Sequence, residues 1–172
     1  MPFDAQPHLD GDLLRLRPLR PGDFDDLYRV ASDPLLWEQH PASNRHEPEV
    51  FAEFFRDAID SGGALVAIDT ADDRIIGSSR YHGFDADRSE VEIGWTFLAR
   101  SHWGGEYNRA MKRLMLDHAF RFVRSVVLII GPENHRSRRA AEKIGGVLDG
   151  TRKDDTGLES VVYRVTTPLA GG

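Results

Sequence analysis

The chain has 172 residues, of which 40% are hydrophobic and 29% charged, with a formal net charge of −6 at pH 7 and no cysteine. These values predict one globular domain with a single substantial core. They exclude disulfides, thiolate metal sites and a cysteine nucleophile, and the acidic balance argues against a general nucleic-acid binder while allowing a cationic substrate.

Two further observations bear on location. The longest apolar run, VVLII at residues 126–130, is far too short to span a bilayer. Residues 1–10 are polar and lack the apolar core of a secretory signal. We therefore expect a cytoplasmic protein with neither a membrane nor a nucleic acid as partner.

The first half of the chain predicts a strand, two helices and two further strands. The segment LLRLRPL alternates apolar and charged residues, as a strand with two faces does. Asp23 is a good N-cap for the first helix, which Asp33-Pro34 ends. The expected elements are a flexible arm at residues 1–12, a strand at 13–19, a helix at 23–33, a helix at 48–61, and strands at 64–69 and 74–84.

The second half is organised around residues 91–123. The alternation of Val91, Ile93, Trp95 and Phe97 with polar or small residues predicts a strand with Glu92 on the opposite face. A helix follows the glycines at 104 and 105, and its apolar stripe contains Met111, Leu114, Met115, His118, Ala119 and Phe122. A strand at 126–130, a helix at 137–144 and strands at 147–148 and 160–165 complete the chain.

The strand–helix–strand unit sets the topology. Such a unit crosses over right-handedly, so the strands at 91–97 and 126–130 are expected to be parallel neighbours. The order of elements predicts a single mixed α/β domain.

The glycine turn before the central helix is the first candidate site. A strand that enters a helix through glycines leaves free backbone N–H groups at the positive end of the helix dipole, where an anion binds well. The turn lacks both the P-loop ending and the G-x-G-x-x-G fingerprint. A bound polyphosphate and a solvated basic face both remain open as the reason for the cations around it, which are Arg100, His102, Arg109, Lys112 and Arg113.

The second candidate site follows the strand at 126–130. Ligands dock at the carboxyl ends of parallel strands, so Asn134 and Ser137 are expected to share one cleft with the glycine turn. Both residues are also good helix caps, and this alternative stays open.

Three motifs occur in a fixed order: Glu92-Ile93-Gly94-Trp95, then Trp103-Gly104-Gly105-Glu106-Tyr107, then Asn134-x-x-Ser137 with Glu142-Lys143-Ile144-Gly145. In this order they resemble the GNAT superfamily of N-acetyltransferases, and within it the ribosomal-protein acetyltransferase branch of RimJ/RimL type. The similarity implies one acyl-CoA N-acyltransferase domain over residues 13–168. It also implies a central mixed sheet, antiparallel in its N-terminal part, with two splayed parallel strands and flanking helices.

The resemblance implies acetyl-CoA as acyl donor and direct attack by a substrate amine, without a metal. The turn amides would bind the pyrophosphate, and the pantetheine arm would pair with backbone near Trp95–Leu98. The implied cofactor-binding residues are Trp95, Thr96, Phe97, Leu98, Arg100, His102, Trp103, Gly104, Gly105, Glu106, Tyr107, Asn108, Asn134, Ser137 and Arg138.

The chain departs from the family pattern at three positions, of which Gly146, in place of the usual aromatic residue, is one. Glu106 replaces the second glycine of the turn, and a carboxylate beside a pyrophosphate is repulsive unless it points away or is paired. Ala141 stands where many relatives have a tyrosine that acts as general acid. The resemblance therefore leaves the Ser137 hydroxyl as the group expected to protonate the leaving thiolate.

An ammonium must lose a proton before it can attack, so the reaction needs a base. Glu92 is the preferred base, directly or through water, and neighbouring Glu90 is expected to raise the pKa of one of the two carboxylates. Glu92 instead pairs with Arg80 across the hairpin in the alternative interpretation. His40 and His82 are alternative bases.

In similar enzymes the helical N-terminal segment covers the acceptor site, so the resemblance implies Trp37 and Arg45 as acceptor contacts. Arg80, on the strand at 74–84, is also expected to contact the acceptor, and Phe51 and Phe54 are expected in the core. The acceptor is expected to be a protein or peptide N-terminal amine or a small-molecule amine. Homodimers are common among similar proteins. No histidine spacing predicts a metal site. A catalytically inactive acyl-CoA-binding sensor or partner module is the alternative function.

Overall fold

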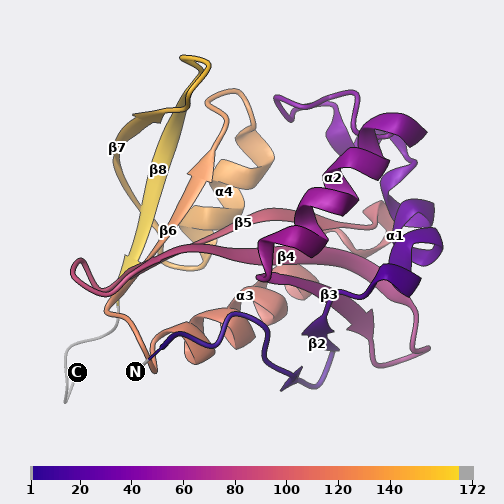
Figure 1. The fold of residues 1–172 in the computed structure, drawn as a ribbon, viewed down its shortest axis with the longest axis horizontal. Helices are drawn as coiled ribbons and strands as arrows, with labels where there is room; N and C mark the ends of the chain where they lie inside the picture. Colours follow the sequence, from indigo (N-terminus) through magenta and orange to yellow (C-terminus); the bar gives the residue numbers. More distant parts are fainter. Residues whose placement is uncertain (1, 167–172) are drawn as a thin grey trace.

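The computed structural model describes residues 2–166 (Figure 1). An eight-stranded sheet has the order β1-β2-β3-β4-β5-β6-β8-β7. The strands are β1 (Leu9–Asp10), β2 (Leu14–Pro18), β3 (Ala64–Asp69), β4 (Ile75–Asp85), β5 (Glu90–Leu98), β6 (Ser125–Ile130), β7 (Val147–Lys153) and β8 (Glu159–Thr166). The helices are α1 (Phe24–Ala31), α2 (Pro48–Ser61), α3 (Glu106–Ala119) and α4 (His135–Lys143), with 3-10 turns η1 (Pro21–Asp23), η2 (Pro34–Trp37) and η3 (Arg100–His102). The expected domain end at residue 168 lies outside the described residues.

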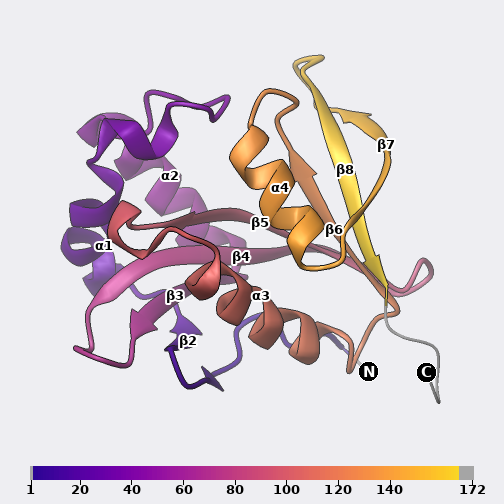
Figure 2. The same ribbon diagram turned by 180° about the vertical axis from the view of Figure 1, so that it is seen from behind.

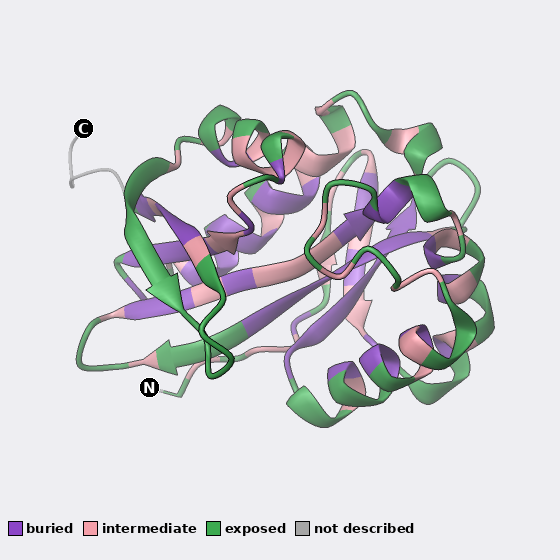
Figure 3. Ribbon diagram, turned by 90° about the horizontal axis from the view of Figure 1, so that it is seen from above, coloured by how far each residue is buried: buried purple, intermediate pink, exposed green. Residues whose placement is uncertain are grey.

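Helices cover both faces of the sheet. Helices α1 and α2 lie on one face and α3 on the other (Figures 1 and 2). The α3 core includes Met111, Met115 and Ala119, all 0% exposed, which confirms the predicted apolar stripe. The α2 core includes Phe51 and Phe54. Figure 3 shows that buried residues concentrate in the middle of the sheet, whereas β7 is exposed along its length.

The ends of α2 follow from local sequence. Pro48 occupies the first turn, where its missing N–H costs nothing. Gly62 ends the helix with φ 67°, a left-handed conformation that favours glycine. The helix therefore begins and ends as the sequence predicts.

Strands β5 and β6 are parallel, as predicted, and they splay apart. Their pairing runs from Glu90–Ser125 to Glu92–Val127 and stops there. Beyond this point the inner edges of both strands have no strand partner on that side within the described residues. The divergence of β5 and β6 can be followed in Figure 2, and residues of both strands line the cleft described below.

A β-bulge in β5 contradicts one sequence expectation. The β4–β5 register shifts between Ser78 and Arg80, and Trp95 has φ 53°, which is unusual for a bulky side chain. As a result Ile93 belongs to the α3 core, whereas Trp95 packs against the α2 core. The prediction that these two residues share one face was wrong, because the extra residue at the bulge reverses the alternation.

The N-terminal segment contains a strand that the sequence does not predict, and β7, near the C-terminal end, is longer than predicted. In the segment expected to be a flexible arm, β1 pairs with β2, and Phe3 stacks edge-on against Tyr81 and Phe122. Strand β7 continues to Lys153, beyond its predicted end. None of the described helices has the length and apolar character needed to cross a membrane.

Candidate active site

A cleft of about 690 Å³ lies where β5 and β6 diverge. Its walls come from β5, the turn before α3, the start of α4 and the η2–α2 loop. It brings together these predicted site residues: Trp37, Arg45, Glu92, Trp95, Thr96, Phe97, Leu98, His102, Trp103, Gly104, Gly105, Asn108, Asn134 and Ser137. Five predicted residues lie outside its lining, namely Arg80, Arg100, Glu106, Tyr107 and Arg138.

Glu92 lies in the cleft with its carboxylate over Gly94. A Cβ built on Gly94 would lie 2.9 Å from Glu92 Oε2. Burial raises the pKa of Glu92 to about 7, and the nearby Glu90 charge adds to this rise, while Arg152 and Arg80 oppose it. Its partner across the hairpin is His82 rather than Arg80, and no carboxylate–arginine pair joins Glu92 to Arg80 in residues 2–166. A carboxylate with this pKa can take up and release a proton near neutral pH.

Glu90 has a different environment. Its two oxygens accept from Arg164 at 2.8 Å and Arg152 at 3.4 Å. These charge-assisted bonds outweigh burial and hold the pKa of Glu90 below its usual value. Glu90 is therefore an ion-pair residue and is not suited to accept a proton.

The two histidines considered as bases are less suited than Glu92. Burial, reinforced by Arg45 and Arg136, lowers the pKa of His40 to about 4. Its Nδ1 accepts from the Ala42 N–H at 2.9 Å. His82 is exposed and packs edge-on against Trp95.

The glycine turn presents unfilled space and free donors. Gly104 is exposed with φ 121°, and Gly105 is the N-cap of α3 with φ 97°. No side chain caps the first turn of α3, so its N–H groups remain available. Lys143 Nζ lies 3.9 Å from the position of a Gly105 Cβ, and Arg109 also lines the cleft. Glu106 is exposed outside the cleft lining, at the helix end where its charge is favourable.

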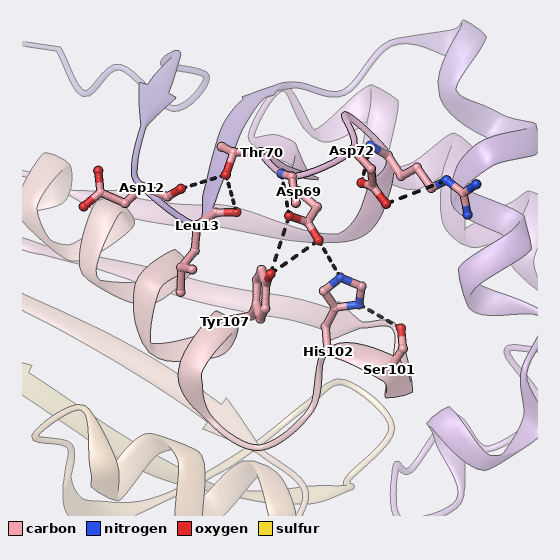
Figure 4. Close-up of polar contacts among 10 residues, drawn as sticks. Asp12, Leu13, Asp69, Thr70, Asp72, Ser101, His102 and Tyr107 are labelled. Atoms are coloured by element: carbon pink, nitrogen blue, oxygen red, sulfur yellow. Dashed lines mark hydrogen bonds and ion pairs between the residues drawn. The ribbon is translucent and has the colours of Figure 1, made fainter.

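Asp69 holds this turn against β3 (Figure 4). The buried carboxylate lies 2.8 Å from His102 Nε2 and 3.4 Å from the Tyr107 hydroxyl, which donates to it. Ser101 Oγ lies 2.8 Å from His102 Nδ1, but Ser101 is exposed and outside the cleft lining. These residues therefore brace the turn. Sequence reasoning missed Asp69, and the only available signal was an acid at the end of an apolar strand.

Asn134 caps α4 and also lines the cleft. Its Oδ1 accepts from the Ser137 N–H at 3.3 Å, so its capping role is realised. The half-buried Ser137 lies in the cleft lining on the first turn of α4. Arg138 lies elsewhere, with its Nε donating to the Tyr163 hydroxyl at 3.2 Å and its Nη1 to the Pro132 carbonyl at 2.9 Å.

A contact bridges the two walls of the cleft. Arg136, which follows β6, places its Cζ 3.9 Å from the ring centroid of Trp103, which follows β5. Arg136 Nη2 also donates to the Leu36 carbonyl at 3.1 Å. Sequence reasoning did not single out Arg136, because the contact depends on how the two strands splay.

A smaller pocket of about 360 Å³ adjoins the cleft on the α2 side of the sheet. Arg45 and Trp95 line both spaces, and Arg80 lines the smaller one. Trp37 is 2% exposed and donates its Nε1–H to the Ala31 carbonyl at 2.8 Å, so it forms the floor beneath Arg45. In residues 2–166 no three His, Cys, Asp or Glu side chains are grouped to hold a metal ion.

Comparisons with known proteins are consistent with this geometry. A family model described as "Acetyltransferase (GNAT) domain" matches residues 14–147. No curated protein matches the sequence.

Solved structures share the fold at low sequence identity. A GCN5-related N-acetyltransferase from Brucella melitensis is 19% identical, with TM-score 0.84 over 96% of this chain and 80% of that one. A GNAT-family protein from Chromobacterium violaceum is 20% identical, with TM-score 0.81 over 95% and 86%. Mycobacterium smegmatis RimJ in complex with CoA-disulfide is 22% identical, with TM-score 0.64 over 90% and 82%. At these identities the structures establish the fold alone.

Proposed function

The chain belongs to the GNAT acetyltransferase domain family, and from this premise we propose that it moves the acetyl group of acetyl-CoA directly to a primary amine, with Glu92 as base and Ser137 as acid. The enzyme is an acetyl-CoA-dependent N-acetyltransferase. What we propose beyond this activity is the chemical class of the acceptor and the roles of Glu92 and Ser137.

The residues in the cleft fit acetyl-CoA. Free N–H groups at the start of α3, together with Lys143 and Arg109, suit a diphosphate. The unpaired inner edge of β5 beyond Glu92 offers backbone groups to an amide-containing chain. RimJ from M. smegmatis has been solved with CoA-disulfide on this fold. Bound here, acetyl-CoA supplies the activated acetyl group as a thioester.

Glu92 accepts a proton from the acceptor ammonium. Its pKa of about 7 lets it be largely ionised in slightly alkaline solution and still basic enough to remove a proton. The transfer is direct or passes through one water molecule. The product of this step is a neutral amine, which is the nucleophile.

Ser137 donates a proton to the sulfur of CoA as the carbon–sulfur bond breaks, and its oxygen takes back the second proton that the attacking nitrogen loses when the amide forms. Its hydroxyl lies in the cleft lining at the start of α4, where the positive end of the helix dipole stabilises developing negative charge. Ala141, on the same helix, has no hydroxyl to donate. Ser137 is therefore the proton donor in the proposed reaction.

The single observation that carries this proposal is the position of Glu92, desolvated in the cleft just where β5 leaves β6. The acceptor classes are a protein or peptide N-terminal amine and a small-molecule amine. A cytoplasmic location and a homodimer stay predictions.

The proposal is tested by release of free thiol from acetyl-CoA across a panel of amines, with mass spectrometry of the products. Acetylated amine formed in step with thiol supports it. Thermal stabilisation by acetyl-CoA without thiol release on any amine would contradict it and favour the non-catalytic binding module.

A further inference from the structure

Arg80 is a buried cation with unsatisfied donors. The residue is 6% exposed, and its Nε and Nη2 are buried without a hydrogen-bond partner in the described chain. Its Cζ lies 4.4 Å from the ring centroid of Trp95 and 5.5 Å from that of Phe54. Aromatic contact offsets only part of the free energy lost when a guanidinium leaves water. At least two N–H groups of Arg80 therefore lack an acceptor.

The Arg45 guanidinium is a second cation near the Phe54 ring. Its Cζ lies 4.4 Å from the Phe54 centroid and 5.2 Å from that of Trp37. Burial and the Arg80 charge lower the pKa of Arg45 to about 10. Two desolvated like charges repel each other, and an anion between them would remove this cost.

The pocket also contains two acids, Glu53 and Asp57. Both are exposed on α2. Neither forms an ion pair with Arg45 or Arg80 at the 4.0 Å limit within residues 2–166. The charge of Asp57 favours the cationic form of Arg80, but water screens an exposed carboxylate. The acids therefore leave the Arg80 donors unsatisfied.

The arginines lie beside the proposed base. Arg80 pairs with Gly94 across β4 and β5, and the Glu92 carboxylate lies over this same Gly94. The charges of Arg80 and Glu92 each affect the other's pKa. A molecule that places an amine at Glu92 therefore has its adjacent atoms near the arginine pair.

We infer that the acceptor is a small amino carboxylate, whose carboxylate binds Arg45 and Arg80 while its amine faces Glu92. This inference rests on the proposed function. Guanidinium groups bind a carboxylate through charge-assisted hydrogen bonds in a fixed geometry. A free amino acid carries both groups a few bonds apart. In a protein N-terminus the α-carboxylate has become an amide.

The test compares free amino acids with their own carboxamides as acceptors. The probes are the L-amino acids, β-alanine and γ-aminobutyrate, and the readout is kcat/KM at saturating acetyl-CoA. The wild-type enzyme is expected to favour at least one carboxylate over its carboxamide by tenfold or more, about the value of one charge-assisted bond. Arg80→Gln and Arg45→Gln are expected to bring this ratio close to one.

A binding measurement separates this inference from catalysis. Calorimetry of the CoA-loaded enzyme with N-acetyl amino acids and their carboxamides is expected to show the same preference in Kd, again lost in Arg80→Gln and Arg45→Gln. Arg56→Gln, on the exposed part of α2 outside both pockets, is the matched control and should keep the wild-type ratio. Arg45→Gln alters a half-buried residue on an irregular segment, so it keeps the test valid if Arg80→Gln fails to fold.

The outcomes are distinct. Equal kcat/KM for carboxylates and their carboxamides would overturn this inference and leave acetyl transfer intact. Faster acetylation of a neutral, C-terminally amidated peptide would have the same meaning. If no amine is acetylated, the proposed function fails and the Kd ratio still decides whether the arginines bind a carboxylate. A ratio unchanged in both arginine variants also overturns the inference.

Discussion

The Glu92 carboxylate lies over Gly94 so closely that a methyl group at position 94 would sit 2.9 Å from its Oε2. The proposed base therefore needs a residue without a side chain at position 94. The atom in the way is the end of a flexible side chain, so a larger residue should displace the carboxylate without unfolding the sheet.

Gly94→Ala is expected to lower kcat by about 10- to 100-fold, because a displacement of about 1 Å from a reactive geometry costs this much. The unfolding midpoint should stay within about 2 °C of wild type. The control is Gly22→Ala, where the new methyl meets nothing within 4 Å. Wild-type kcat in Gly94→Ala would show that the position of Glu92 does not matter.

The pH dependence of kcat should report Glu92. The base acts in its ionised form, so kcat should rise with an apparent pKa of about 7. Replacing the exposed Glu133 with Gln should leave this profile unchanged. A kcat that does not change between pH 6 and pH 8 would argue against Glu92 as the base.

The contribution of Glu92 to stability should change with pH in the direction opposite to kcat. The folded state raises the pKa of this acid, so between the unfolded value and about 7 the folded chain binds more protons than the unfolded chain. The Glu92 contribution to the free energy of unfolding therefore falls as pH rises through this window. Urea unfolding at pH 5 and pH 8 should show a smaller change in Glu92→Gln than in wild type. An equal change in both proteins would contradict the raised pKa.

Asp69→Ala should weaken acetyl-CoA binding more than it slows the chemical step. The substitution removes the acceptor of His102 and Tyr107, which hold the turn before α3. The KM for acetyl-CoA is expected to rise about tenfold, equivalent to about 1.4 kcal/mol, with kcat within threefold of wild type. Asp72→Ala, an exposed acid in the next turn, is the control. A change in kcat alone would assign Asp69 a different role.

Lys143→Gln should also raise the KM for acetyl-CoA, because its Nζ lies near Gly105 at the proposed diphosphate site. An effect through charge should shrink as salt increases. Lys153→Gln, on exposed β7, should match wild type at every salt concentration. A salt-independent effect in Lys143→Gln would indicate lost packing instead.

Much of the fold can be predicted from local sequence patterns. The position of the cleft follows from the topology that places β5 beside β6. The stripe at Met111 and Met115 predicts α3, and the crossover rule predicts that β5 and β6 are parallel. The bulge at Trp95 could not be predicted, because it arises from the pairing of β4 with β5 and leaves no periodic signal.

The candidate site was predicted less completely than the fold. Motif residues such as Gly104 and Asn134 lie in the cleft, since short motifs mark the strand ends where ligands bind. Asp69, Arg136 and Lys143 were missed as site residues, because each acts on a residue distant in sequence. The unsatisfied donors of Arg80 depend on three-dimensional burial, so no sequence pattern could reveal them.

The most direct test of the proposed mechanism is the single-turnover rate of acetyl transfer at pH 8 in Glu92→Gln, measured on the best acceptor of the wild-type enzyme. Loss of the base is expected to lower this rate by at least about 100-fold, while the Kd for acetyl-CoA stays within twofold of wild type. A rate within threefold of wild type would contradict the central claim that Glu92 takes the proton from the attacking amine.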